Sequence, residues 1–441
     1  AAIEAEIADM SEEDRKAFGM KGTFPIGKHY VKMGQTTSLS TAIHMDILRS
    51  HVVSVFGKRG SGKSYSIMAM AEGMMSLEPE LTHNLSIVVF DTMGIFWTMK
   101  HENKKDEKLL REWGLQYQRF NIRVYAPFGS YPEYKERGIP VDFPFSISPS
   151  ELSSSDWCGI FDIDITSQFG ALIGSVIAGM KKQRQVFSIK DIIAAVNADE
   201  RTNDEVKAAV ENMFSSAEEW GLFSEKATPV SELAIGGQIT VIDVSPYAVA
   251  GGKSNIRGLV IGIVAKKLFN ERMLVRKVEE LASIKRTTSF SRTGASEKKE
   301  IPLIWLFVDE AHEFLPRHGT TPATNALITV LREGRQPGIS LVLASQQPGQ
   351  IHTDVMTQSD VVISHRITAK IDVDALGALM QSYMREGLAK SLDDLPRVKG
   401  AGILFDDTNE RLYPMRVRPR ITWHGGSSPS LVAEAKGILE F

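Results

Sequence analysis

The sequence predicts a doubly wound α/β fold, in which a mainly parallel sheet carries a helical insertion and a short strand-rich N-terminal segment. Three observations lead to this fold class. Nearly continuous apolar runs alternate with helical patterns along most of the chain, as expected for parallel strands covered by helices on both faces. A glycine-rich turn joins the first core run to a helix, and residues 150–221 carry helical periodicity.

Four segments follow one another along the chain. Residues 1–50 show short alternating stretches, which predict a strand-rich lead-in that is either a remnant or a part of a β-barrel domain. Residues 51–149 form the first part of the core, with strands predicted at 51–56, 85–90 and 122–126. Residues 150–235 form the helical insertion. Residues 236–441 form the second part of the core with a C-terminal segment, with strands predicted at 238–243, 303–308, 340–344 and 360–364 and a polar loop at 285–300.

The composition is that of an ordinary globular protein. Of the 441 residues, 43% are hydrophobic and 24% are charged. The apolar runs are far shorter than the roughly 20 residues that cross a membrane, so we expect no membrane partner. A single cysteine, Cys158, excludes an internal disulfide framework, and the acidic start lacks a secretory signal, so we expect a cytoplasmic protein. The net charge of −3 gives no global basic field, although a ring-shaped motor can confine positive charge to its channel.

A phosphate-binding loop is predicted between the strand at 51–56 and the helix at 63–75. Gly57, Gly60, Ser61, Gly62, Lys63 and Ser64 match the pattern G-x-x-x-x-G-K-[ST], in which backbone N–H groups surround a phosphate at a helix N-terminus. Lys63 would reach the β- and γ-phosphates of ATP, and the Ser64 hydroxyl would bind Mg²⁺. The alternative is a chance glycine-rich turn, but the strand and the helix stand where the motif needs them.

Two carboxylates follow the apolar strand at 303–308. This places Asp309 at the carboxyl edge of the sheet, where it can hold Mg²⁺, while Glu310 can act as the general base on the attacking water. The alternative is that both residues cap the next helix. His312 has no second histidine four residues on, so a zinc site is not expected.

Further polar residues follow or precede other strands. Asp91 either orients water or Mg²⁺ or caps the next segment, and Gln346 either contacts the γ-phosphate or belongs to a polar turn. Arg332 and Arg335 end a helix, where a guanidinium can bind a γ-phosphate through two charge-assisted hydrogen bonds or can serve only as a dipole partner. We favour a catalytic role for Arg335 and leave Arg332 open.

Together these motifs resemble the HerA branch of the HerA/FtsK ATPases over roughly residues 35–420. The resemblance rests on the phosphate loop preceded by His51-Val52, on Asp91, and on the segments Asp309-Glu310-Ala311-His312, Arg332-Glu333-Gly334-Arg335 and Ala344-Ser345-Gln346-Gln347-Pro348. It implies a RecA-like core in a homohexameric ring that threads double-stranded DNA and translocates by ATP hydrolysis, with ATP between subunits.

The resemblance also implies roles for single residues. Lys63 and Ser64 would bind nucleotide, Asp309 would serve Mg²⁺, Glu310 would activate water, Gln346 would sense the γ-phosphate and Arg335 would stabilise the transferring phosphoryl group. Arg49 is a weaker candidate for reaching the site of a neighbouring subunit. Family members carry a small β-barrel before the core, and the residues before Gly57 are too few for a complete one, so we expect it to be shortened or missing.

Three functions remain open at this point. The first is a DNA translocase or helicase that works with a nuclease or another effector in DNA processing or antiphage defence. The second is a ring-shaped regulatory scaffold that assembles and activates an effector enzyme. The third is a secretion or conjugation motor. DNA-stimulated ATPase activity would favour the first, and effector activation by a ring that cannot hydrolyse ATP would favour the second.

Overall fold

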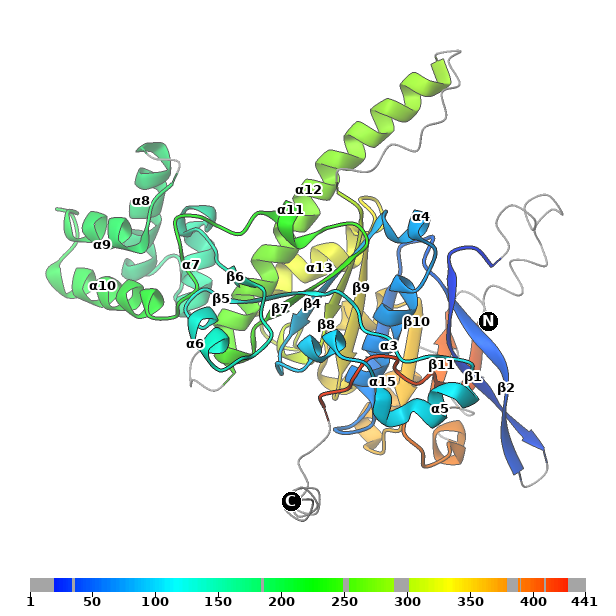
Figure 1. The fold of residues 1–441 in the computed structure, drawn as a ribbon. Coiled ribbons are helices and arrows are strands. Elements are labelled where there is room, and N and C mark those ends of the chain that lie inside the picture. Colours follow the sequence, from blue (N-terminus) through cyan, green and yellow to red (C-terminus); the bar gives the residue numbers. More distant parts are fainter. Residues whose placement is uncertain are drawn as a thin grey trace, which may run out of the picture.

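The computed structural model describes residues 20–33, 36–183, 186–248, 254–288, 301–378, 388, 390–407 and 410–426. One large sheet runs through the molecule (Figure 1). Its strands are β1 (Thr23–Met33), β2 (Thr36–Asp46), β3 (Val52–Phe56), β4 (Leu85–Asp91), β5 (Arg123–Pro127), β6 (Phe143–Phe145), β7 (Gln238–Asp243), β8 (Leu303–Val308), β9 (Ile339–Ser345), β10 (Val361–His365), β11 (Ala401–Asp406) and β12 (Arg411–Val417).

Helices connect these strands and make up the segment between β6 and β7. They are α3 (Lys63–Met75), α4 (Pro79–Thr82), α5 (Glu107–Glu112), α6 (Tyr131–Glu136), α7 (Ser154–Phe161), α8 (Gln168–Gln183), α9 (Ile189–Asn197), α10 (Asp204–Glu218), α11 (Val230–Leu233), α12 (Ser254–Thr288), α13 (Thr324–Glu333), α14 (Thr353–Gln358) and α15 (Lys370–Gly377). None of the helices in the described residues combines the length and the apolar character that a membrane span needs.

Within the described residues, the twelve strands lie in the order β2-β1-β12-β11-β10-β3-β9-β8-β4-β7-β5-β6. From β10 to β6 all neighbours pair in parallel, whereas β2, β1, β12 and β11 add an antiparallel end. The mainly parallel α/β fold predicted from the sequence is therefore confirmed. The strand-rich lead-in continues the core sheet, because β1 pairs with β12.

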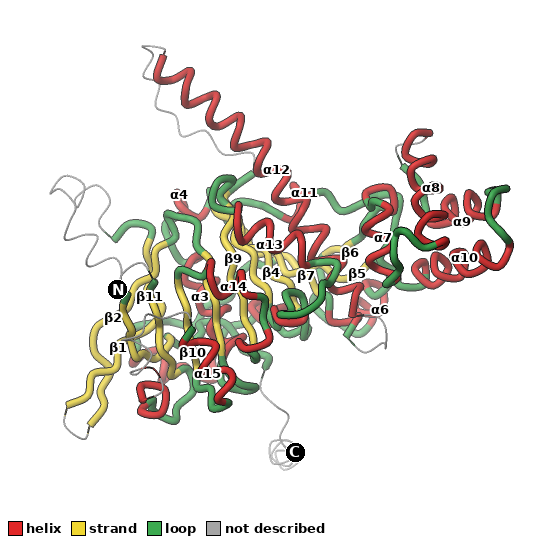
Figure 2. The backbone as a smooth tube through the Cα atoms, turned by 180° about the vertical axis from the view of Figure 1, so that it is seen from behind, coloured by secondary structure: helices red, strands yellow, loops and turns green. Residues whose placement is uncertain are grey.

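Both faces of the sheet are covered, which explains the continuous apolar runs of the strands. Side chains alternate along a strand, so Ile87 and Val89 of β4 join one hydrophobic cluster and Val88 and Phe90 join the other. Helix α3 packs on the first face, and α12 and α13 pack on the second (Figure 1, Figure 2). The sheet is thus held on both sides, and its carboxyl edge is a fixed platform for a site.

Helices α7 to α10 form the predicted helical insertion at one end of the sheet (Figure 1). Trp157 of α7 packs against Phe214 of α10 and against Phe223, with ring centroids 4.9 and 5.1 Å apart. The outer boundaries of the four predicted segments remain predictions.

Helix α12 extends further than the sequence indicated. Its outer part projects from the body of the molecule (Figure 1, Figure 2). The predicted loop at 285–300 was placed too early, because residues 285–288 still belong to α12, and lysine and arginine are good helix formers. The rest of that predicted loop, residues 289–300, lies outside the described residues.

Candidate nucleotide site

The phosphate loop lies between the end of β3 and the start of α3. Gly60 and Gly62 have φ values of 75° and 111°, a backbone region that side chains other than glycine rarely enter. A Cβ at Gly60 would meet no other atom within 4 Å, so conformation and not space requires glycine there. Lys63 begins the helix and is only 5% exposed. Burial lowers the pKa of Lys63, and the nearby carboxylates of Glu310 and Asp309 oppose that shift.

Ser64 and Asp309 meet at this loop, as predicted. The Ser64 hydroxyl donates a 2.6 Å hydrogen bond to Asp309 Oδ2, and the backbone N–H of Glu310 donates to Oδ1 at 2.9 Å. Burial raises the pKa of Asp309, against the hydrogen bond from Ser64. The hydroxyl of Ser64 and the carboxylate of Asp309 are therefore held side by side, and such oxygen ligands are the donors that Mg²⁺ prefers. Burial of a charged carboxylate without a partner costs free energy, which a bound cation would offset.

Glu310 stands next to Gln346. The side-chain amide of Gln346 donates a hydrogen bond to Glu310 Oε1, so the ends of β8 and β9 are linked through these two side chains. Glu310 adopts a left-handed backbone conformation with φ of 51°, which is costly for a residue with a side chain. Its Oε2 is buried and makes no hydrogen bond within the described residues, and Nδ1 of His312 lies 3.6 Å away. This oxygen can accept a proton from a bound water.

Asp91 caps the segment that follows β4. Its two carboxylate oxygens accept backbone N–H hydrogen bonds of 2.7 Å from Gly94 and Phe96. Burial and the charge of Asp243 on the neighbouring strand raise the pKa of Asp91. The structure thus favours the capping alternative over a role with water or Mg²⁺.

The two arginines lie at the opposite edge of the sheet from the phosphate loop. Arg335 stands between α13 and the start of β9, whereas Gln346 follows the end of that strand. Six steps along β9 separate the edges by roughly 20 Å. Arg335 therefore does not reach the phosphate loop of its own chain, and its predicted catalytic role is restricted to a site on another subunit. Arg332 donates to Asp354 at 2.6 Å and is a surface ion pair.

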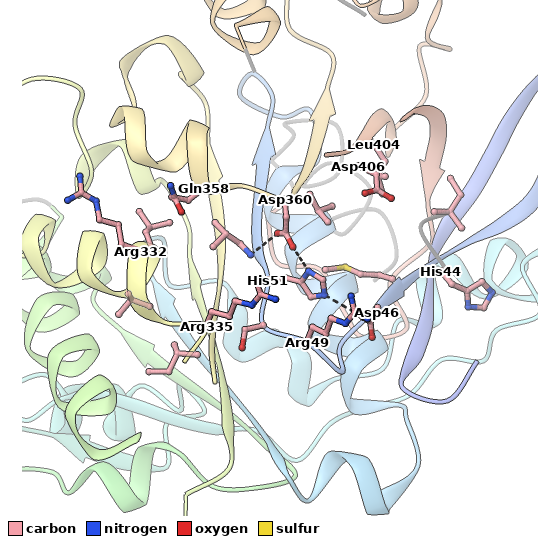
Figure 3. A pocket seen from close by; sticks show the side chains of 18 residues that line it. His44, Asp46, Arg49, His51, Arg332, Arg335, Gln358, Asp360, Leu404 and Asp406 are labelled. Atoms are coloured by element: carbon pink, nitrogen blue, oxygen red, sulfur yellow. Dashed lines mark hydrogen bonds and ion pairs between the residues drawn. The ribbon is translucent and has the colours of Figure 1, made fainter. Parts of the chain in front are cut away.

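A pocket of about 530 Å³ opens at this opposite edge (Figure 3). Arg49, Arg332 and Arg335 line it, together with His51 and Asp360. The close-up shows Arg335 reaching from the segment after α13 toward Arg49 and His51 of the turn before β3, with Asp360 beside His51, whereas the Arg332 side chain extends away from them. The pocket thus brings Arg49 and Arg335 close to His51, while Asp46, Asp360 and Asp406 also line it.

The sequence analysis missed His365, which supports the phosphate loop from behind. His365 is fully buried, and its Nδ1 donates to the carbonyl of Ala401 at 3.0 Å. Its Nε2 therefore accepts the 2.8 Å hydrogen bond from the Ser66 hydroxyl of α3. Burial lowers the pKa of His365 to about 4, so the ring is neutral. A Cβ at Gly57 would lie 2.8 Å from the Cβ of His365, which shows how closely the loop rests on it.

These residues fit a nucleotide with Mg²⁺. The Ser61 hydroxyl in the phosphate loop is buried without a partner in the described part of the chain, as is Glu310 Oε2, and both suit an added phosphate or water. No cluster of three or more histidine, cysteine, aspartate or glutamate side chains able to hold a metal occurs among the described residues. Mg²⁺ binds through one or two protein oxygens, waters and substrate phosphates, and Ser64 and Asp309 supply two such oxygens.

Comparison with known proteins places these features in a family. A family model described as the central domain of the helicase HerA matches residues 24–258, more than half of the chain. The chain belongs to the HerA family of P-loop ATPases. The DNA double-strand break repair helicase HerA of Pyrococcus furiosus is 27% identical over 146 residues, which make up 31% of this chain and 26% of that protein. The probable DNA double-strand break repair helicase HerA of Methanocaldococcus jannaschii is 30% identical over 142 residues, with coverage of 31% and 28%.

The similarity of this HerA family chain to those two relatives thus spans about a quarter of their length. Among solved structures, VirB4 of Thermoanaerobacter pseudethanolicus superimposes with a TM-score of 0.54 at 12% identity, covering 90% of this chain and 96% of that one. This likeness concerns the fold. It agrees with the RecA-like core that the HerA resemblance implied.

Proposed function

We propose that this HerA family chain hydrolyses ATP with Mg²⁺ and that a homohexameric ring of it uses the hydrolysis to move along double-stranded DNA. One observation carries the proposal. The phosphate loop, the Ser64–Asp309 pair and the Glu310–Gln346 pair lie together at one edge of the sheet, while the pocket that contains Arg49 and Arg335 lies at the other. This arrangement supports a hydrolytic site that is completed by a second subunit.

The residues at the phosphate loop have separate roles in phosphoryl transfer. Lys63 presents its ammonium group from a nearly buried position, where its charge acts on phosphate with little screening. Ser64 and Asp309 hold the metal side of the site. Mg²⁺ supplies charge neutralisation to the β- and γ-phosphates when it is bound. Because Gln346 occupies Glu310 Oε1, the carboxylate presents Oε2 to the attacking water and takes its proton.

A head-to-tail ring brings opposite faces of neighbouring subunits together. In such a ring, Arg335 of one subunit can face the phosphate loop of the next, where its guanidinium would stabilise the charge that develops in the transition state. Arg49 lines the same pocket and would accompany it. The family resemblance is the support for the remaining parts of the proposal. These are the six subunits, the DNA substrate, and a nuclease or other effector in DNA processing or antiphage defence.

The test is the ATPase rate of a sample of known native mass, measured with and without duplex DNA. We expect a mass of six subunits, Mg²⁺-dependent turnover and a rate that rises several-fold with DNA. A monomeric active enzyme would overturn the two-subunit site, and a ring whose turnover ignores DNA would overturn the translocase. A Glu310→Gln ring that still activates an effector would point to the regulatory scaffold instead.

A further inference from the structure

His51 occupies the centre of the pocket at the edge opposite the phosphate loop. Its ring Nδ1 is hydrogen-bonded to Asp360 Oδ2, and its Nε2 lies 3.7 Å from Asp46 Oδ2. The side chain of His51 is only 16% exposed. One imidazole thus bridges the last residue of β2 and the residue before β10, and it stands directly before β3.

Each carboxylate in this bridge is also fixed by the backbone. Asp360 Oδ1 accepts the N–H of Val52 at 2.9 Å, and Asp46 Oδ1 accepts the N–H of Leu48 at 2.8 Å. The N–H of His51 itself donates to the Ser340 hydroxyl of β9 at 3.1 Å. Four strand ends therefore meet around the ring, and both ends of the five-residue connection 47–51 are pinned.

A positively charged ring strengthens both contacts, because an imidazolium donates its Nδ1–H to Asp360 and attracts the Asp46 carboxylate, whose Oδ2 lies 3.7 Å from Nε2 as an ion pair without a hydrogen bond. The charged groups that face it are Asp360 and Asp46, with Arg49 acting on Asp46, and the Trp305 ring of β8 lies against it at 6.1 Å between centroids. Burial alone would lower the pKa of His51, but the two carboxylates outweigh burial and raise it to about 9. The ring is charged at neutral pH.

We propose that His51 is a positioning residue, whose bridge between Asp46 and Asp360 fixes the connection 47–51 and thereby holds Arg49 in the wall of the pocket shared with Arg335. The proposal rests on the proposed function, in which this pocket meets the phosphate loop of the neighbouring subunit. Arg49 lies within the pinned connection, three residues after Asp46 and two before His51. A displacement of about 1 Å in a catalytic group can cost about a hundredfold in rate, so a short pinned connection is an effective support.

Loss of the bridge should change turnover more than binding. ATP is held mainly by the phosphate loop of the other subunit, so His51→Gln should lower kcat by about tenfold and change KM for ATP by less than about twofold. The matched control is His29→Gln, a half-buried histidine of β1 outside the pocket, which should leave both constants near the parent values. Both variants are measured as full-length rings of verified mass with duplex DNA present.

Two further readouts separate positioning from a general structural role. The parent enzyme should lose kcat as pH rises through about 9, where His51 releases its proton, and His51→Gln should lack this loss while His29→Gln retains it. If His51 acts through Arg49, the double variant Arg49→Ala, His51→Gln should be no slower than Arg49→Ala alone within about twofold. Asp46→Asn keeps the bond to Asp360, so it provides a milder variant if His51→Gln does not assemble, and its alkaline loss should move to lower pH.

The outcomes distinguish a failure of the proposed two-subunit function from a failure of the positioning role of His51 alone. If Arg335→Ala and Arg49→Ala both turn over ATP like the parent, the pocket is not part of the active site and the proposed two-subunit function fails. If those variants are slow but His51→Gln matches His29→Gln, only the positioning role is wrong. A double variant that shows the product of the two single losses would also overturn it, because His51 would then act independently of Arg49.

Discussion

Replacement of Arg335 by alanine tests whether the hydrolytic site spans two subunits. The side chain is exposed and stands before β9, roughly 20 Å along the strand from the phosphate loop of its own chain. An arginine on the γ-phosphate contributes about 10³- to 10⁵-fold to turnover, whereas an exposed helix-end charge contributes about 1 kcal/mol of stability or less. We therefore expect turnover to fall at least about a hundredfold, with ATP affinity and thermal stability close to the parent values.

Mixing this variant with Glu310→Gln protein identifies the subunit on which Arg335 acts. In a ring assembled at random from equal amounts, an Arg335→Ala subunit keeps Glu310 and can receive Arg335 from a Glu310→Gln neighbour, so roughly a quarter of the interfaces are complete if the arginine acts across a head-to-tail contact. If it acts within its own subunit, no interface is complete. The assay is steady-state ATPase rate against mixing ratio after subunit exchange, and an optimum near equal amounts is expected.

The control is Arg332→Ala, three residues earlier on the same helix end. Arg332 is committed to Asp354 and is 60% exposed, so its loss should change turnover by less than about threefold. If Arg335→Ala also loses less than about threefold, Arg335 is not catalytic. A slow Arg335→Ala ring that no mixture restores would refute action in trans.

Three further changes test the site and the fold around it. Lys63→Ala should abolish nucleotide binding or turnover, with an unchanged thermal unfolding curve, because Lys63 supplies charge to phosphates; normal ATPase activity would overturn the site. Asp91→Asn should lower the free energy of unfolding by about 1–3 kcal/mol, because the amide nitrogen that replaces one carboxylate oxygen cannot accept the backbone N–H bonds made there by Phe96 or by Met93 and Gly94, yet turnover per folded molecule should be unchanged. A selective loss of turnover would instead give Asp91 a catalytic role. The pKa of His51 is raised in the folded state, so its protonation should add up to about 3 kcal/mol to the free energy of unfolding below pH 6.5, and this stabilisation should disappear as pH rises through about 9. The unfolding temperature of His51→Gln should not show that decline. An equal decline in both proteins would contradict the prediction.

Much of the fold was predictable because its signals are local. The buried parallel strands are short runs of apolar residues, and the phosphate loop is a contiguous motif whose strand and helix flank it directly. The prediction of α3 at 63–75 agrees with the structure because glycine fixes its start at Gly62. Asp309 and Glu310 could be placed at the carboxyl edge since they follow a strand whose direction in a parallel sheet is set by the phosphate-loop strand.

The His51 bridge could not be predicted in this way. Its partners lie five residues before it and 309 residues after it, and nothing in the sequence near Asp360 indicates that this aspartate faces a histidine. His365 was hidden for the same reason, because its bond to Ser66 joins residues 299 positions apart. Contacts of this kind depend on which strands become neighbours, and β3 lies between β9 and β10 only after the whole chain has been arranged.

For Arg335 the catalytic role stays a prediction, but its position relative to the phosphate loop could have been predicted from the sequence. The predicted strand at 340–344 lies between Arg335 and Gln346, so the two residues flank opposite ends of one strand and cannot share an edge of the sheet. A parallel sheet collects the residues that follow its strands at one edge and those that precede them at the other. A cation that directly precedes a strand therefore lies at the edge away from the phosphate site of its own subunit. For a P-loop chain, whether an arginine precedes or follows a core strand indicates whether it can act on the site of its own subunit or only on that of a neighbour.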